Sequence, residues 1–385
     1  MREILTAGGP NYSIPPASFW RRLRKGGLGA NLDPRLAAEE ISQLFLGVRI
    51  QCARCHNHPG ERWTQDDYHG LAAIFARIEG GQVVKVKASG EVIHPRTLEK
   101  ALQRIPGEDF LGADIVDGRG RLASWLTDPG NPYFSRAIVN RLWKAMMGRG
   151  LVEPADDFRA TNPPTHPRLL DALADHFEKT GYDLKALVRV IASSTTYQLS
   201  SVPNGHNAKD KHYYSRFQPK RLTAEVLYDS LNDLILARSN FGGLPVGTRA
   251  VCLPDNSYNS SNYFLSVFGR PDSSSACECE RSQEASLAQS LHLFNAKNIH
   301  EQLARKDGRA ARFAADKSRD HAAKINNLYY QAFARLPRTE EADVALAYLT
   351  REVVDKEGKP ADKTKERYED ILWALANTKE FLFNH

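Results

Sequence analysis

The sequence predicts a mainly α, multi-helical chain of two domains with one small β-hairpin. Most of its long segments carry apolar residues three or four positions apart, which is the spacing of one helix face. The clearest strand signal is the stretch Gln82–His94, whose character alternates on both sides of Ser89-Gly90. The run Asp128–Pro132, rich in Pro and Gly, predicts a boundary between domains 1–128 and 129–385.

Two helices are predicted to surround the most informative part of the first domain. The first of them begins at Asp33, a good N-cap, with Pro34 in its first turn, and we expect it to run straight into Cys52. The second spans Thr64–Ile78, with acidic residues in its first turn, where they suit the helix dipole. Before them, residues 1–32 form an irregular lead-in with one short basic helix, Ser18–Lys25.

The second domain is predicted to be helical almost to its end. Two long polar loops, at residues 200–215 and 238–275, interrupt the pattern, and loops of such length often carry function. The predicted helices are Tyr133–Met147, Pro167–Thr180, Leu184–Ser194, Thr223–Ala237, Ser286–Phe294, Ile325–Phe333, Glu340–Val354 and Lys365–Phe383.

The motif Cys52-Ala53-Arg54-Cys55-His56 is the strongest chemical signal in the chain. In Cys-x-x-Cys-His, two thiols attach covalently to haem c and the adjacent imidazole binds the iron. Cys52 and Cys55 are therefore predicted as attachment residues and His56 as the proximal ligand, in a protein of electron transfer or other redox function. A distal ligand is not evident. Candidates by residue type are Met146, Met147, His69, His94 and His166, and for the two methionines we favour core packing.

A non-haem metal site is the alternative. Cys277 and Cys279 form a second close pair of thiols, and together with Cys52 and Cys55 they would complete a four-thiolate site for Zn or Fe. His56 and His58 are alternative ligands for the same ion. Such a site would give the protein a structural or interaction role rather than electron transfer.

Composition restricts the other classes of function. The 385 residues carry a net charge of +6, but basic and acidic residues are interspersed, so we expect no nucleic-acid binding. No apolar run is long enough for a transmembrane helix. Hydrolase, kinase, P-loop and dinucleotide-binding motifs are absent, which leaves enzymatic activity open. His292, Asp255, Glu280 and Arg281 are the residues that a catalytic role would draw on.

The chain resembles the planctomycete cytochrome-c-like proteins. In that family a cytochrome-like domain of unknown function, DUF1549, precedes a planctomycete-specific domain of unknown function, DUF1553. The resemblance lies in Ser42–Arg49 and the Cys52–Pro59 motif of the first domain. In the second domain it lies in Ala137–Trp143, Phe268–Pro271 with Cys277-x-Cys279-Glu280-Arg281, and Leu372–Asn384.

The resemblance implies an exported or periplasmic protein with a haem or metal role and an unknown redox partner or exported partner protein. It also implies that the first domain is truncated at its N-terminus and that an export signal is lost upstream. Two residues depart from the family pattern. The family often has an acid where this chain has Asn57, which would orient an imidazole more weakly, and an aromatic residue where it has Gly60.

Overall fold

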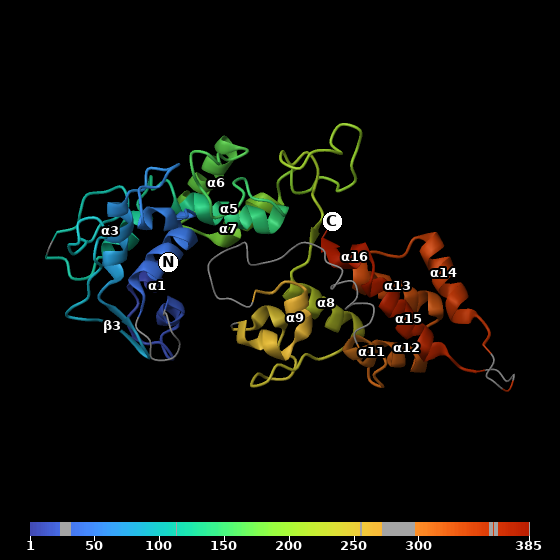
Figure 1. The fold of residues 1–385 in the computed structure, drawn as a ribbon. Coiled ribbons are helices and arrows are strands. Elements are labelled where there is room, and N and C mark those ends of the chain that lie inside the picture. The colour runs from blue at the N-terminus through green and yellow to red at the C-terminus, as the bar shows by residue number, and fades with distance from the viewer. Residues whose placement is uncertain are drawn as a thin grey trace. The chain divides into compact units, whose positions relative to one another are not determined.

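The chain folds into two compact units, most of whose elements are helices (Figure 1). The computed structural model describes residues 1–23, 32–112, 114–254, 256–271, 297–353, 357 and 361–384. Among these, residues 1–218 make up the first unit and residues from 219 onward the second. The predicted mainly α fold is confirmed. The predicted domain boundary at residue 128 falls inside the first unit, between two of its helices, and stays a prediction.

The first unit contains seven described α-helices, three short helical turns of other types (η) and a small antiparallel sheet. Its elements are α1 (Arg2–Thr6), β1 (Gly9–Pro10), η1 (Pro15–Leu23), α2 (Pro34–Ile41), η2 (Ser42–Leu46), η3 (Gln51–Arg54), α3 (Gln65–Phe75), β2 (Ile78–Gly80), β3 (Val83–Val86), α4 (Arg119–Leu126), α5 (Phe134–Met147), α6 (Pro167–Lys179) and α7 (Leu184–Ala192).

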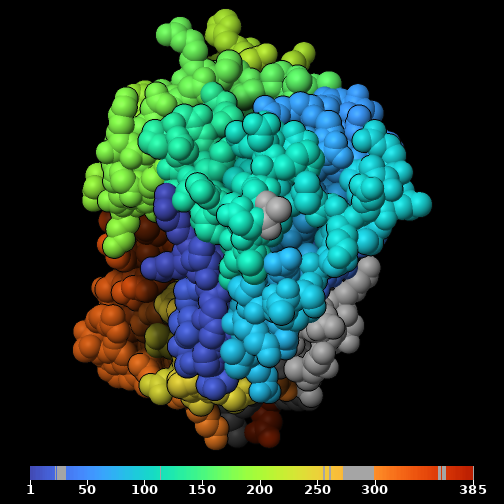
Figure 2. Space-filling view, turned by 90° about the vertical axis from the view of Figure 1, so that its left-hand side faces the viewer, coloured from blue at the N-terminus to red at the C-terminus, as the bar shows by residue number. Residues whose placement is uncertain are grey.

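Two apolar cores stabilise this unit. In the first, α2 packs on α3, and Trp20 from η1 lies 5.8 Å from the ring of Phe75. In the second, α5 packs against α6 and α7 around Trp143. Figure 2 shows the surface over the first core, where the N-terminal residues (dark blue) lie beside residues of the small sheet (light blue), with which β1 pairs.

Gly47 ends the helix that precedes the cysteine motif. The α-helix stops at Ile41, continues as the π-type turn η2, and is closed by Gly47 at φ +70°. The expectation that this helix runs straight into Cys52 is therefore wrong. The reason is tertiary, because a Cβ at residue 47 would lie 2.8 Å from the ring of Phe158, whose N–H donates to the Gly47 carbonyl (2.9 Å).

A fully buried carboxylate, Asp156, fixes the same segment from the side. It accepts a hydrogen bond from the amide of Gln43 and one of 2.7 Å from Nη2 of Arg49. Burial alone would raise the pKa of Asp156, but the bonds from Gln43 and Arg49 outweigh it and lower the pKa. Arg141 of α5 donates to the Gln43 carbonyl (2.7 Å). The chain on both sides of Gly47 is thus attached to later parts of the unit.

The strand Val83–Val86 is confirmed, but its predicted partner is wrong. It pairs with β2 and β1, with Gly80 and Gly9 both opposite Val84. The stretch Glu91–His94 contributes only an isolated bridge from Ile93 to Lys100. Gly90 explains the error. It does not make a hairpin turn but lets the chain approach the backbone of Ala76, where a Cβ would meet the carbonyl oxygen at 2.1 Å.

The second unit is a group of helices closed by a two-stranded sheet. Its elements are β4 (Lys220–Arg221), α8 (Ala224–Ile235), η4 (Ala250–Cys252), η5 (Asn256–Ser261), α9 (Tyr263–Val267), α11 (Lys297–Leu303), α12 (Arg309–Ala315), α13 (His321–Phe333), α14 (Thr339–Thr350), α15 (Thr364–Ala376), α16 (Lys379–Leu382) and β5 (Phe383–Asn384). Because β4 pairs with β5, the first and last described residues of the unit lie side by side.

Most predicted helices are found within a few residues of their expected bounds. The main exceptions are short: α1, α4, α9, α11 and α12 are not predicted from the sequence, and the predicted helix Lys365–Phe383 is divided into α15 and α16. The predicted helix Ser286–Phe294 lies outside the described residues.

No helix in the described part of the chain is both long and apolar enough to cross a membrane.

The Gly47 turn predicts a specific loss of stability. Replacing Gly47 with Ala forces an L-residue into the left-handed region and also places a methyl group against Phe158. We expect the free energy of unfolding, measured by urea denaturation, to fall by about 2 kcal/mol or more. Gly130→Ala is the matched control, because Gly130 has φ +94° but nothing within 4 Å of the added Cβ. Equal losses in the two variants would contradict the proposed clash.

Candidate functional site

The Cys-x-x-Cys-His motif forms a tight turn with its reactive groups in solvent. Ala53 is fully buried and holds η3 on the first core, whereas Cys52, Cys55 and His56 are exposed. Both thiols are free. The N–H groups of Cys55 and His56 donate to the Cys52 carbonyl, each at 3.4 Å. One short turn therefore presents two thiols and an imidazole.

The N-terminus of α3 holds this turn in place. Gln65 donates from Nε2 to the Cys55 carbonyl (2.8 Å) and from its N–H to Oδ1 of Asn57 (3.1 Å). Thr64 and Asp67 form a reciprocal capping box, which fixes the first turn of the helix. The side chain of Asn57 therefore caps Gln65, instead of orienting an imidazole as expected.

The two motif histidines have different roles. Nδ1 of the exposed His56 lies 2.7 Å from the Asn57 carbonyl, so Nδ1 carries the proton and donates it, which leaves the Nε2 lone pair free for a metal. His58 carries its proton on the other nitrogen. Its Nδ1 accepts a hydrogen bond from the N–H of Gly60 (3.2 Å), so Nε2 holds the proton in the neutral ring. In this conformation His56 is the better ligand.

The proposed joint metal site is not brought together by the residues that the structure describes. Cys277 and Cys279 lie outside them, as do the catalytic candidates Asp255, Glu280, Arg281 and His292. Within the described ranges, no three His, Cys, Asp or Glu side chains are grouped so as to hold a metal ion. The contribution of the second cysteine pair stays a prediction.

Two buried imidazoles lie directly behind the turn. Nε2 of His69 lies 3.1 Å from the carbonyl of Arg54, and its ring lies 5.0 Å from that of His94. His94 accepts from the N–H of Arg96 through Nδ1 (3.2 Å), and its Nε2 lies 3.1 Å from Oδ1 of Asp66. Burial lowers the pKa of His69. Of these two candidate distal ligands, His69 supports the turn from the core side and His94 packs against His69.

The remaining candidate distal ligands lie in the second core of this unit. Met147 is buried among its apolar side chains, as expected for a packing residue, and Met146 packs at its edge. The ring of His166 contacts those of Tyr213 and Tyr214, at 6.0 and 5.9 Å.

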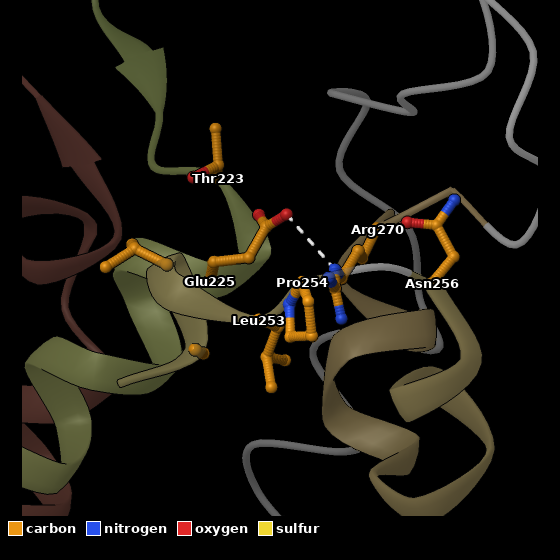
Figure 3. Close-up of a pocket in the computed structure, with 8 residues that line it drawn as sticks. Thr223, Glu225, Leu253, Pro254, Asn256 and Arg270 are labelled. Atoms are coloured by element: carbon orange, nitrogen blue, oxygen red, sulfur yellow. Dashed lines mark ion pairs between the residues drawn. The ribbon is translucent and has the colours of Figure 1, made fainter. Parts of the chain in front are cut away.

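The second unit contains a polar pocket of about 420 Å³ with a buried ion pair in its wall (Figure 3). Nε of Arg270 lies 3.3 Å from Oε1 of Glu225, which stands in the first turn of α8. Arg270 also donates to Oδ1 of Asn259 (3.1 Å). Thr223 and Asn256 add polar groups to the lining.

This pocket is not predicted by the sequence. Glu225 gives no signal, since an acidic residue in a first helical turn is ordinary. Arg270 stands out only as part of the Phe268–Pro271 resemblance. The pocket depends on two segments far apart in sequence, and only the folded chain shows that their charges meet.

The comparison with known protein families agrees with the order of segments expected from the sequence. Residues 118–349, more than half of the chain, match the family model PSD1, described as a protein of unknown function (DUF1553). The chain belongs to the PSD1 family. Residues 30–80 of this PSD1 chain match a second model, PSCyt2, also described as a protein of unknown function (DUF1549), and this span includes the Cys52–His56 turn. No curated protein and no solved structure matches the chain.

Burial of His69 predicts a pH dependence of stability. The pKa of His69 in the folded chain lies below the ordinary value of 6.5. As the pH falls below 6.5, His69 therefore binds a proton in the unfolded chain before it does so in the folded chain. The contribution of His69 is therefore complete above about pH 6.5 and is lost as the pH falls. Urea midpoints at neutral and mildly acidic pH should show a smaller acid loss in His69→Gln than in the parent. Val246→Ala, at an exposed site with no titrating group, should keep the parent's dependence. An unchanged slope in His69→Gln would refute the assignment.

The ion pair in the pocket predicts a large effect of removing one partner. Glu225→Ala removes the carboxylate that lies 3.3 Å from the buried guanidinium of Arg270, so we expect a loss of about 3 kcal/mol in the free energy of unfolding. Asp343→Ala removes an exposed acid of α14 and should change stability by less than about 0.5 kcal/mol. Similar losses in both variants, measured by chemical denaturation, would show that the buried pair has no special importance.

Proposed function

We propose that the first unit of this PSD1 chain carries a covalently attached haem c, with thioether bonds to Cys52 and Cys55 and His56 as the proximal iron ligand. When bound, such a group supplies one-electron oxidation and reduction. The chain would then transfer electrons in an exported system, to or from a redox partner of unknown identity. In this proposal the PSCyt2 segment has the cytochrome-like character expected from the sequence.

The single observation that carries the proposal is the state of His56 beside two accessible thiols. Its Nδ1 is bonded to the Asn57 carbonyl, which fixes the tautomer that leaves Nε2 free, and the ring is exposed. A histidine bound to a metal commonly donates its other N–H in this way. Both thiols are free and exposed on the same turn, so an attachment enzyme can reach them.

The residues around the motif would hold it in position. Gln65 binds both sides of the turn through the Cys55 carbonyl and Asn57. Ala53 anchors η3 in the core, and His69 bonds to the Arg54 carbonyl from behind. A cofactor attached to a braced turn needs little reorganisation when its charge changes, which suits electron transfer.

Localisation follows from the same proposal. Haem is attached to Cys-x-x-Cys-His outside the cytoplasm, so the protein would act in the periplasm or beyond.

The alternative is a Zn or Fe site that uses the same thiols with His56 or His58 and the pair Cys277 and Cys279. The Nδ1 bond of His58 to Gly60 makes His56 the better imidazole ligand for either site.

The haem proposal predicts the colour of the protein. Expressed for export in a host that attaches haem c, the chain should show a Soret band, and the haem should stay on the chain through denaturation. Cys52→Ala and Cys55→Ala together should abolish this covalent haem. His56→Ala should keep the attached haem but change the spectrum of its iron. Cys252→Ala is the matched control, since Cys252 is also free and exposed but outside the motif.

A colourless protein would refute the proposal. If that protein contains zinc or iron by elemental analysis, and loses it when Cys52 and Cys55 are replaced, the metal site takes its place. If the protein contains neither haem nor a metal ion, the function of the turn would depend on the thiols of Cys52 and Cys55 themselves.

A further inference from the structure

We propose that a groove between α14 and α15 binds an amphipathic, basic helix of a partner protein. The groove lies in the second unit, and the inference does not depend on haem attachment. Its volume is about 620 Å³, and its lining includes Val344 and Tyr348 of α14 with Ile371 and Ala374 of α15. A hollow of this size accommodates several side chains of a partner.

The apolar surface of helix α14 is wider than the stripe that packs against the core. Ala345 and Leu349, four residues apart, are buried in the core of the unit. Val344 and Tyr348 have the same spacing one position earlier, about 100° around the helix, where they are 71% and 39% exposed. A helix that packs on one side only normally carries polar residues outside its core stripe. The exposed stripe of Val344 and Tyr348 is therefore a surface for an interaction.

The wall formed by α15 complements this face. Ala374 is exposed, and its small side chain leaves room between α14 and α15. Trp373 and Tyr329 add aromatic surface to the lining. Figure 1 shows α14 at the edge of the helices of its unit, on the side away from α8 and α9, where a partner can approach.

The charges of the groove select a basic partner. Among the residues that the structure describes, its lining contains Glu340, Glu341 and Asp370 but no Lys or Arg. The guanidinium of Arg335 bonds both Glu341 and Glu380, so it is shared between two carboxylates. The charges of Arg351 and Arg367 also act on Tyr348. Lys or Arg residues that flank an apolar stripe would meet Glu340 and Asp370, both of which are exposed.

The shape favours a helix over an extended strand. The groove is bounded by two packed helices of 12 and 13 residues, and a third helix laid between them completes a three-helix arrangement. A helix of about 14 residues is about 21 Å long, which matches the length of the groove walls.

The test uses a helical peptide made only of leucine and lysine, with leucines at helical spacing on one face. A fluorescently labelled peptide of this kind should bind the full chain with a Kd on the order of 10 μM or below, and more weakly as salt is raised. A peptide of the same pattern with glutamate in place of lysine should bind at least about tenfold more weakly.

Variants of the chain place the binding in the groove. Val344→Glu adds a charge to the apolar face, and Ala374→Leu fills the groove without adding charge. Each should weaken the leucine–lysine peptide at least about tenfold. Val246→Glu is the matched control, because Val246 is a loop valine of the same unit with 65% exposure, and it should bind as the parent does. Both groove residues are exposed, so circular dichroism should stay unchanged.

Two outcomes overturn the proposal. The first is that Val344→Glu and Ala374→Leu bind the peptide as tightly as Val246→Glu does. The second is that the parent sediments as a dimer that Val344→Glu dissociates, because the occupant is then a second copy of this chain.

Discussion

The buried carboxylate of Asp156 is the contact on which the geometry of the first unit depends. It holds Gln43 and Arg49, which stand on opposite sides of the Gly47 turn, and so fixes the point where the chain leaves α2 and approaches the cysteine motif. Asp156 lies in the PSD1 match, whereas Gln43 and Arg49 lie in the PSCyt2 match. The first part of the PSD1 segment therefore shares one folded unit with the PSCyt2 segment, and the turn that carries the thiols is positioned by residues of both.

Local signals were enough to predict most of the helices. The cap at Asp33 and the capping box of Thr64 depend on residues within four positions of each other, and both are present. The predictions that were wrong concern features that depend on contacts between residues far apart in the sequence. The break at Gly47 needs Phe158, and the pairing of Val83–Val86 was misassigned because Gly90 serves a close approach to Ala76 rather than a turn.

The candidate site shows the same division. The residue types of Cys52, Cys55 and His56 were evident from the sequence, but their exposure, and the tautomer that the Asn57 carbonyl gives His56, were not. The pair of Glu225 and Arg270 joins the first turn of α8 to the residues after α9, so no local pattern could predict it. The exposed stripe of Val344 and Tyr348 on α14 could not be predicted for a related reason. Helical spacing does not tell which part of a wide apolar surface meets the core.

The exposure of two thiols on one tight turn also has a consequence for the proposed attachment of haem. In an oxidising compartment, neighbouring accessible thiols are substrates for disulfide formation, and an oxidised pair cannot form thioether bonds. Neither sulfur is protected by burial or by a disulfide bond. Folding alone thus leaves both thiols open to oxidation, so the proposed attachment would require a dithiol reductant that keeps Cys52 and Cys55 reduced.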